Sequence, residues 1–506
     1  MSKVQQSLKI FVCGIITQAV TMGMGILIPR LLIVNYGSEV NGLLSSIRQV
    51  FVYVALLEAG VGMASLQALY APVARDDYRG ASAVLAATHY YYRRTGILYG
   101  LCVLALAVVY PLVIKSNISF SVVAGVILLQ GASGVINYFF QGKYTILLRV
   151  AGRSYITTNT ATVVNVVSKV VQISLITAGF NIIAVQAAYF VVNIAQMLYI
   201  ACYVRRNFQW LDLTEKPNVA ALSQSRNVIV HNVSGLIFNN TGGVLLTVFC
   251  GLTSVSVYSL YSMLLACIAG SIDTVCNSVE FVLGQAFNSN RSYFMKLQEV
   301  FESYYLALFF SAFTIALLLL PPFLKLYTAG IADANYIDST LLYLFIAFYV
   351  LMYARRTSSQ IINFAGHFKQ TQWRSVLESA INLSISFSLV KPLGMYGVLA
   401  GAIAALLYRT NDIIIYANLK ILGRAPWHTY RRWGQNLLLM FLCHWGIKAF
   451  LPDINDYGML VAHGIWVSLL CSAVFFVADS LCDRESFHLV VSVFRKHLIS
   501  RLKAAN

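Results

Sequence analysis

The segment FESYYLALFFSAFTIALLLLPPFL, residues 301–324, contains one charged residue. An α-helix needs about 20 predominantly apolar residues to cross the hydrocarbon core of a bilayer, so this segment predicts a membrane span. Thirteen further segments meet the same test, and we expect an all-α polytopic membrane protein with about 14 transmembrane helices. These segments are 10–33, 42–68, 95–114, 118–140, 156–179, 182–204, 227–250, 254–282, 338–364, 374–391, 395–418, 434–451 and 458–481.

The composition agrees with a membrane protein. Of the 506 residues, 58% are hydrophobic and 11% are charged, whereas typical soluble domains are about 25% charged. The net charge of +17 does not indicate nucleic acid, because Lys and Arg are spread between apolar segments and form no dense patch. The nine Cys contain no CxxC pair, and the His residues lack ligand spacing. We therefore expect no metal and no cofactor.

The distribution of Lys and Arg predicts the orientation. With the N-terminus inside, 26 of the 36 basic residues fall in cytoplasmic segments and 5 at outer ends. Because cytoplasmic loops carry an excess of Lys and Arg, both termini are predicted to lie in the cytoplasm. The first apolar run has no signal-peptide cleavage pattern, and we interpret it as the first span.

The predicted organisation is six plus six plus two helices. Residues 1–208 form an N-terminal six-helix lobe, 209–225 a cytoplasmic linker, 226–424 a second six-helix lobe, and 425–506 helices 13 and 14 with a cytoplasmic tail. Turns that follow the first helix of each half, at 36–42 and 250–256, suggest parallel repeats. We expect short interfacial or cytoplasmic helices at Arg79–Arg94 and Arg291–Glu302, and close helix packing at the GxxxG of Gly397 and Gly401.

Polar residues recur at helical spacing within several predicted spans. Steps of three and four place them on one face of each helix. For a single helix, hydrogen bonding between helices is the simpler explanation, but stripes on several helices favour a shared polar cavity. The stripes are Thr158, Thr162, Asn165, Lys169 and Gln172 in span five; Gln186, Tyr189, Asn193 and Gln196 in span six; and Gln130, Gly134, Asn137 and Gln141 in span four.

Basic residues inside spans predict an anionic cargo, because Arg binds phosphate through a two-pronged fork and Lys through a point charge. Two alternatives stay open: Arg30 lies near a helix end and can extend to the interface, and Arg409 can be neutralised by Asp412. The candidate substrate-binding residues are Arg30, Arg48, Lys169, Arg355, Arg409, Asn165 and Asn239.

Three acidic residues inside spans are candidates for ion coupling: Glu58, Asp273 and Glu280. A carboxylate in a low-dielectric interior can carry a proton, and it can equally serve as counter-ion to an embedded Arg. We predict no catalytic residues, because no HExxH, GxSxG or Walker motif is present. A membrane polymerase or ligase would also need a large outer loop, which the chain lacks.

Eight short motifs are spread along the predicted spans and the turns between them. They are IPR (28–30), YGSEVNG (36–42), LLEAGVG (56–62), FNNT (238–241), VSVYSLY (255–261), AGHFKQTQ (365–372), NL (382–383) and GMYGV (394–398). Over roughly residues 5–425, the chain resembles bacterial polysaccharide flippases of the O-antigen translocase (Wzx) type. Where many relatives have an Asp after the Asn-Asn-Thr stretch, this chain has Gly242 and Gly243.

The resemblance implies the fold of the multidrug, oligosaccharidyl-lipid and polysaccharide exporter superfamily, with two six-helix lobes around a central cavity. It implies a bacterial inner-membrane protein that moves a polyprenyl-pyrophosphate-linked oligosaccharide by alternating access, for O-antigen, lipopolysaccharide or other surface polysaccharide synthesis. The partners implied are that lipid-linked sugar, membrane lipid, H⁺ or Na⁺, and other polysaccharide-assembly proteins. An ion-coupled multidrug exporter of the same fold is the alternative.

Overall fold

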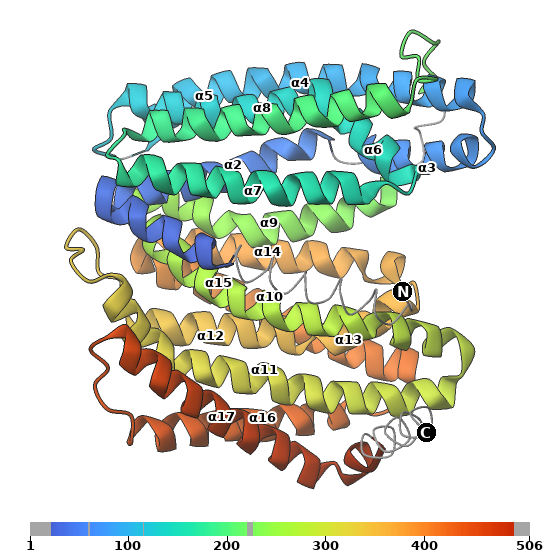
Figure 1. Ribbon diagram of the computed structural model, residues 1–506. Helices are drawn as coiled ribbons and strands as arrows, with labels where there is room; N and C mark the ends of the chain where they lie inside the picture. The colour runs from blue at the N-terminus through green and yellow to red at the C-terminus, as the bar shows by residue number, and fades with distance from the viewer. Residues whose placement is uncertain (1–21, 59–60, 115, 220–225, 490–506) are drawn as a thin grey trace, which may run out of the picture. The chain divides into compact units, whose positions relative to one another are not determined.

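The computed structural model describes residues 22–58, 61–114, 116–219 and 226–489. Within these ranges every regular element is a helix (Figure 1). The packing of the chain defines two compact units, one formed by the described residues up to Leu260 together with Ile331–Ala334, the other by the remainder. The cytoplasmic linker that the sequence predicts at 209–225, between two six-helix lobes, stays a prediction.

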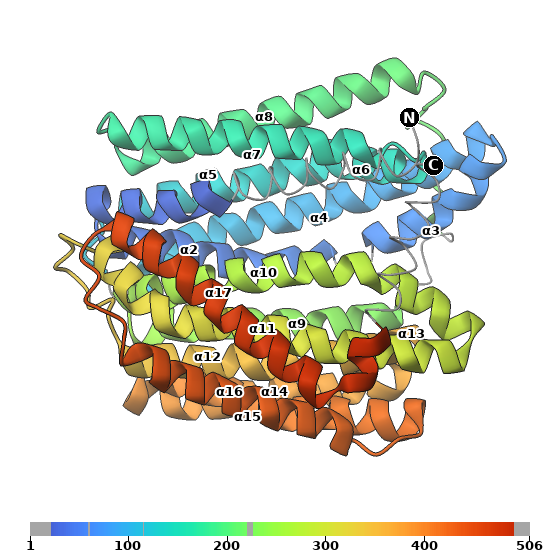
Figure 2. The same cartoon turned by 60° about the horizontal axis from the view of Figure 1, so that its bottom comes forward.

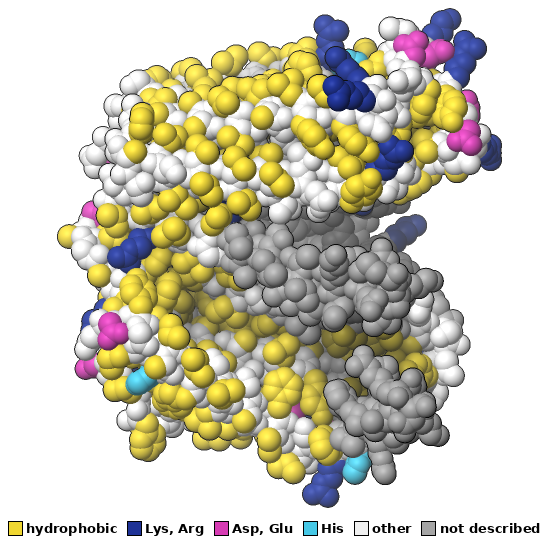
Figure 3. All heavy atoms as spheres, viewed as in Figure 1, with side chains coloured by type: hydrophobic (Ala, Val, Ile, Leu, Met, Phe, Trp, Pro, Cys, Tyr) yellow, Lys and Arg dark blue, Asp and Glu magenta, His cyan; other side chains and the backbone are white. Residues whose placement is uncertain are grey.

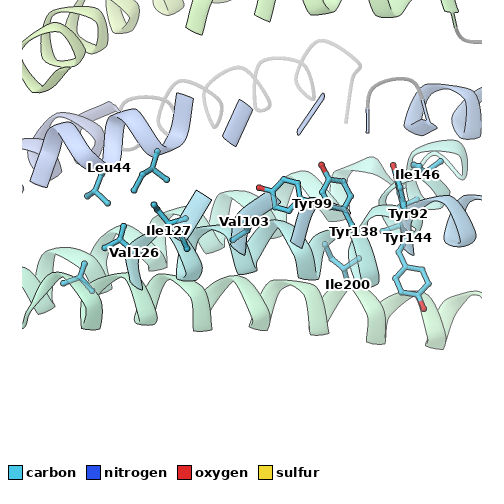
Figure 4. Packing of buried hydrophobic residues seen from close by; sticks show 14 of the residues in the cluster. Leu44, Tyr92, Tyr99, Val103, Val126, Ile127, Tyr138, Tyr144, Ile146 and Ile200 are labelled. Atoms are coloured by element: carbon cyan, nitrogen blue, oxygen red, sulfur yellow. The ribbon is translucent and has the colours of Figure 1, made fainter. Parts of the chain in front are cut away.

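Unit 1 contains a first described helix followed by a series of long helices. Its elements are Met22–Tyr36, α2 (Ser38–Val54), η1 (Ala55–Glu58), α3 (Val61–Ala74), α4 (Tyr78–Val113), α5 (Phe120–Ile136), the π-helix η2 (Asn137–Gln141), α6 (Gly142–Val150), α7 (Ser154–Thr177), α8 (Ile182–Asn207) and α9 (Arg226–Phe249). Helices α4, α5 and α8 run side by side and hold much of its core (Figures 1 and 4).

Helix α10 (Leu252–Ser289) passes from unit 1 into unit 2 after Leu260. The remaining elements of unit 2 are α11 (Arg291–Tyr327), α12 (Ser339–Ala354), α13 (Arg356–Phe364), α14 (Phe368–Leu393), α15 (Met395–Tyr416), the π-helix η4 (Ala417–Leu422), α16 (Trp427–Lys448) and α17 (Tyr457–Cys482). Helix α11 is central, because α12, α16 and α17 all pack against it (Figure 2).

The prediction of an all-α, multi-pass membrane protein is confirmed. In the described part of the chain, nine helices are long and apolar enough to cross a membrane. Two shorter apolar helices, Met22–Tyr36 and Val233–Phe249, together with α12, α14 and α16, account for the other predicted spans. The beginning of the predicted first span, up to residue 21, lies outside the described residues.

Several predicted boundaries were wrong. The span predicted at 42–68 is divided into α2, η1 and α3, and the span predicted at 338–364 is divided at Arg355 into α12 and α13. Neither Arg79–Arg94 nor Arg291–Glu302 forms a separate helix, because each makes up the first turns of a continuous helix, α4 or α11. Asp77 and Asn290 cap these two helices by accepting hydrogen bonds from backbone N–H groups three residues later.

Close packing between α14 and α15 follows from two glycines of the GxxxG motif. A side chain at Gly397 would collide with the backbone of Leu389, and one at Gly401 would collide with Ser386. The expected role of this motif in close helix approach is therefore confirmed.

Candidate functional site

The side chain of Arg48 on α2 is exposed to solvent although many protein atoms surround it, and the phenol of Tyr189 on α8 is close enough to act on its charge. It pairs with none of the carboxylates in the described part of the chain. A guanidinium on an apolar helix without a counter-ion is costly in a membrane protein unless water or a ligand solvates it. Arg48 is thus placed to meet an anionic ligand.

The polar stripe of span five forms one face of α7. Lys169 is half-buried, and its Nζ atom would lie 3.8 Å from a Cβ placed on Gly25 of the first described helix. Arg30 is half-buried on that same helix. Asn165, one turn before Lys169, is exposed. The structure therefore brings the predicted residue Lys169 to the helix that carries Arg30.

Helix α7 also has an exposed apolar face. Val163, Val167 and Val170 are 60%, 43% and 46% exposed. At 3.6 residues per turn they lie on nearly the opposite side from Asn165 and Lys169. One side of α7 suits lipid and the other suits water or a polar ligand.

The other stripes serve packing at least in part. The Nε2 atom of Gln130 on α5 donates to Oε1 of Gln186 on α8 across 3.2 Å. Asn193 and Asn239 each donate to the backbone carbonyl four residues earlier in their own helix. Asn239 is nevertheless exposed on α9, so its carbonyl oxygen is accessible to solvent or ligand.

Helices α2 and α9 are joined by polar contacts within unit 1. Tyr53 and Thr241 share a hydrogen bond of 2.9 Å, and Ser46 bonds to Thr247. A side chain at Gly243 would collide with Gln49 of α2. This close approach gives a physical reason for glycine at position 243.

The acidic candidate of unit 1 is Glu58 in η1. Its Oε1 atom accepts a 2.6 Å hydrogen bond from the hydroxyl of Tyr92, and the hydroxyl of Tyr138 is a second neighbour. Figure 4 shows the hydroxyls of Tyr92, Tyr99 and Tyr138 turned to the same side of the packed helices, whereas Tyr144 points away. Glu58 forms no ion pair with any described Lys or Arg.

In unit 2, two predicted substrate-binding residues belong to one ion-pair network. Arg355 Nη1 lies 2.9 Å from Glu378 Oε1, and Arg409 Nε lies 3.5 Å from Glu378 Oε2. Arg409 Nη1 also lies 2.6 Å from Asp412 Oδ2, which in turn pairs with Arg374. These side chains are at most 22% exposed, so the network links α12, α14 and α15 internally.

The other two acidic candidates, Asp273 and Glu280, both lie half-buried on α10 but have different neighbours. Asp273 Oδ1 lies 3.7 Å from Nε of Arg356, whereas Glu280 Oε2 accepts a long hydrogen bond of 3.5 Å from Gln360. Arg355 and Arg356 are adjacent at the break between α12 and α13, and they bind different acids.

Sequence reasoning missed a second network, centred on Glu302. This carboxylate is 1% exposed and pairs with Arg424 at 2.7 Å and Arg432 at 3.0 Å. Arg432 also pairs with Asp483 after α17. The network joins α11 to η4 and α16. The signal in the sequence was the presence of Glu302 on a predicted membrane span, where an acid calls for a basic partner.

Comparison with known proteins gives a clear result for structure only. No family model and no curated protein matches the chain. A structure described as the lipid II flippase MurJ in an inward closed conformation matches with TM-score 0.65 at 14% identity, covering 94% of this chain and 99% of that one.

Two transporters match over a smaller share of this chain. An inward-facing multidrug resistance MATE family transporter of the MOP superfamily has TM-score 0.58 at 16% identity, covering 79% of this chain and 95% of that one. A MOP superfamily transporter from Pyrococcus furiosus has TM-score 0.52 at 16% identity, covering 81% and 94%. The chain thus has the fold of these membrane transporters.

Proposed function

We propose that this chain is a flippase that moves a polyprenyl-pyrophosphate-linked oligosaccharide across the bacterial cytoplasmic membrane by alternating access, for surface polysaccharide synthesis. The observation that carries the proposal is Arg48, an exposed basic residue on a membrane helix that pairs with no described carboxylate. Arg30, Lys169 and Asn165 extend the polar surface of unit 1 along two further helices. No nucleic acid partner is expected.

In this proposal the polar face and the apolar face of α7 correspond to the polar head and the prenyl chain of the cargo. The polar side, with Asn165 and Lys169, suits the pyrophosphate and sugar hydroxyls, because Lys and Arg form short, strong hydrogen bonds to phosphate oxygens. The valine side suits the prenyl chain, which stays in lipid. Arg355 and Arg409 contribute in this proposal by holding α12, α14 and α15 together, with cargo contact as a secondary role.

Ion coupling, by H⁺ or Na⁺, falls on Glu58 in this proposal. Among the acidic candidates, Asp273 has Arg356 beside it and Glu280 has Gln360, whereas Glu58 is bonded to a tyrosine hydroxyl. A carboxylate without a fixed cation can exchange a proton or bind a cation as its surroundings change.

The extent of the structural match also supports a flippase. The MurJ structure covers 94% of this chain and the first MATE structure covers 79%. The chain, with its two predicted helices beyond the twelve of the lobes, therefore resembles MurJ over more of its length. MurJ is described as a lipid II flippase, and a lipid-linked saccharide is the cargo class that we propose here.

A second candidate is an ion-coupled multidrug exporter. The observation that favours it is the cluster of aromatic hydroxyls around Glu58, since a carboxylate beside Tyr92 and Tyr138 that forms no described ion pair would attract an organic cation. The MATE match names multidrug resistance for that protein.

The test is cargo flipping in proteoliposomes that hold the purified full chain and a fluorescent polyprenyl-pyrophosphate oligosaccharide. We expect protein-dependent flipping that falls about tenfold in Arg48→Ala, the loss of about 1.4 kcal/mol of binding. Lys216→Ala, an exposed lysine in the loop after α8, should flip normally. Two results together would favour the exporter. They are the absence of flipping with several sugars under an imposed ion gradient, and the export of a cationic dye from cells that lack their own pumps.

A further inference from the structure

A buried lysine, Lys143, lies in the first turn of α6. It is 6% exposed, follows directly on the π-helix η2, and places its amine 3.1 Å from Nδ1 of His89 on α4. The amine also lies 5.1 Å from the centre of the Tyr144 ring. In the fold, α6 lies at the end of unit 1 where α3 ends and α4 begins (Figure 1).

No described carboxylate lies within ion-pair distance of Lys143. Three acids at this end of unit 1 are engaged elsewhere. Glu215 pairs with Arg79, Asp77 caps α4, and Asp212 accepts hydrogen bonds from Thr214. Burial of an ammonium group without an anion is expensive, and Lys143 has no anionic partner among the described residues.

The groups around Lys143 add positive charge. The charge of Arg205 at the end of α8 acts on Lys143, and that of Arg93 on α4 acts on His89. Both arginines are exposed, and Figure 3 shows Lys and Arg side chains gathered at this end of unit 1, with hydrophobic side chains along the helices. They mark the side from which an anion would reach the amine.

The 3.1 Å contact fits a charged Lys143 amine that donates to a neutral Nδ1 of His89. A protonated amine donates to a neutral Nδ1, whereas a protonated imidazole would repel it. Burial, and then the charge of Arg205, lower the pKa of Lys143 to about 8. A bound anion would offset both effects and keep the lysine charged.

We propose that Lys143, Arg93 and Arg205 form a binding site for a phosphate group at this end of unit 1. One buried ammonium and two guanidinium groups match the charge and the several acceptor oxygens of phosphate better than those of a single carboxylate. The phosphate belongs either to an anionic lipid headgroup or to a soluble phosphate. The site does not depend on the proposed transport function, since none of its residues is among the proposed cargo ligands.

The test measures binding to the purified full chain in nanodiscs. One experiment titrates inorganic phosphate into phosphatidylcholine nanodiscs and follows the thermal midpoint. The other uses native mass spectrometry to count the phosphatidylglycerol molecules that the chain retains from nanodiscs of mixed phosphatidylcholine and phosphatidylglycerol. The variants are Lys143→Met, Arg205→Ala and the control Lys216→Met, which removes one exposed charge from the loop after α8.

We expect binding in one of the two experiments, at least fivefold weaker in both Lys143→Met and Arg205→Ala and unchanged in Lys216→Met. The experiment that shows binding identifies the source of the phosphate. Affinity should fall above about pH 8, as Lys143 loses its proton. Arg205→Ala keeps the test decisive if Lys143→Met does not fold, because Arg205 is exposed. Binding in neither experiment, or equal weakening in Lys216→Met, would overturn the proposal.

Discussion

The two units contain embedded charges of the same kinds but use them differently. In unit 2, Arg355, Arg356, Arg374 and Arg409 each lie beside an acid on another helix or turn of that unit. In unit 1, Arg48 pairs with no described acid, and Glu58 is bonded to a tyrosine. A charged residue within a span therefore indicates a polar interior. Where the neighbouring helix supplies a counter-ion, the charge holds helices together, and where it supplies none, the charge is available to a ligand.

The largest effect expected from this difference is on stability, in unit 2. Glu378→Ala leaves Arg355 without its carboxylate and removes one of the two from Arg409. Because a buried charge that loses its partner is strongly destabilising, we expect about 3–5 kcal/mol loss of unfolding free energy. Denaturant unfolding in mixed micelles measures it. The matched control is Glu215→Ala, whose partner Arg79 is 85% exposed, and it should cost less than about 1 kcal/mol. Equal losses in both variants would contradict the buried-network interpretation.

Arg48→Ala should lower transport and leave stability nearly unchanged, in contrast to Glu378→Ala. Arg48→Ala removes an exposed charge that makes no described ion pair, so unfolding should change by less than about 0.5 kcal/mol. Transport should fall about tenfold if Arg48 binds cargo. Arg48→Lys should recover part of that loss, because the charge returns without the two-pronged geometry. A destabilised Arg48→Ala protein would place Arg48 with the structural arginines of unit 2.

The sequence predicted where the helices lie better than where they break. Within the described residues each predicted span falls on one or more helices, because membrane thickness sets the length of an apolar segment. The divisions at η1 and at Arg355 were missed. Hydropathy does not detect the acids on α14 and α10 that Arg355 and Arg356 bind at the second of these divisions.

The site residues were predictable by type but not by partner. Helical spacing suggested that Asp412 neutralises Arg409 three residues earlier, and that pair is present at 2.6 Å. Helical spacing could not indicate that Glu378 is a second counter-ion of Arg409 or that Gln130 pairs with Gln186, because each partner lies on another helix. Lys143 lies between two predicted spans, and nothing in its sequence position indicates that the packed helices bury it.

A smaller effect is expected where a carboxylate of unit 1 supports a helix end. Asp333 accepts hydrogen bonds of 2.7 Å from both the backbone N–H and the hydroxyl of Ser38, at the start of α2. Asp333→Ala should cost about 0.5–2 kcal/mol, the range for loss of a helix cap. Thermal unfolding of the purified protein measures this loss.

The control for Asp333→Ala is Asn335→Ala, a nearby exposed residue whose side chain accepts a hydrogen bond from the backbone N–H of Ile337 and so stays within its own loop. We expect this control to change the thermal midpoint less than Asp333→Ala does. No change in Asp333→Ala would show that Gly37 and Ser38 start the helix unaided.

The smallest effect concerns pH and the Asp483 carboxylate, which follows α17. Partial burial alone would raise the pKa of Asp483, but Arg432 and Ser486 outweigh it and hold the pKa below its usual value of 3.8. A carboxyl whose pKa is lower in the folded state stabilises the fold above its unfolded pKa, and this contribution disappears as the pH falls through the folded pKa.

The stability difference between wild type and Asp483→Asn should therefore be constant from about pH 7 to 5 and shrink below about pH 4. We expect it to stay below about 1 kcal/mol, because Arg432 keeps Glu302 as a second partner 3.0 Å away. Thermal midpoints across pH measure the difference, with the exposed Glu485→Gln as control. A difference that grows toward low pH would have the wrong sign for an ion pair. It would mean that Asp483 is stabilised in its protonated form, and that unit 2 does not neutralise this acid as it does Glu378 and Asp412.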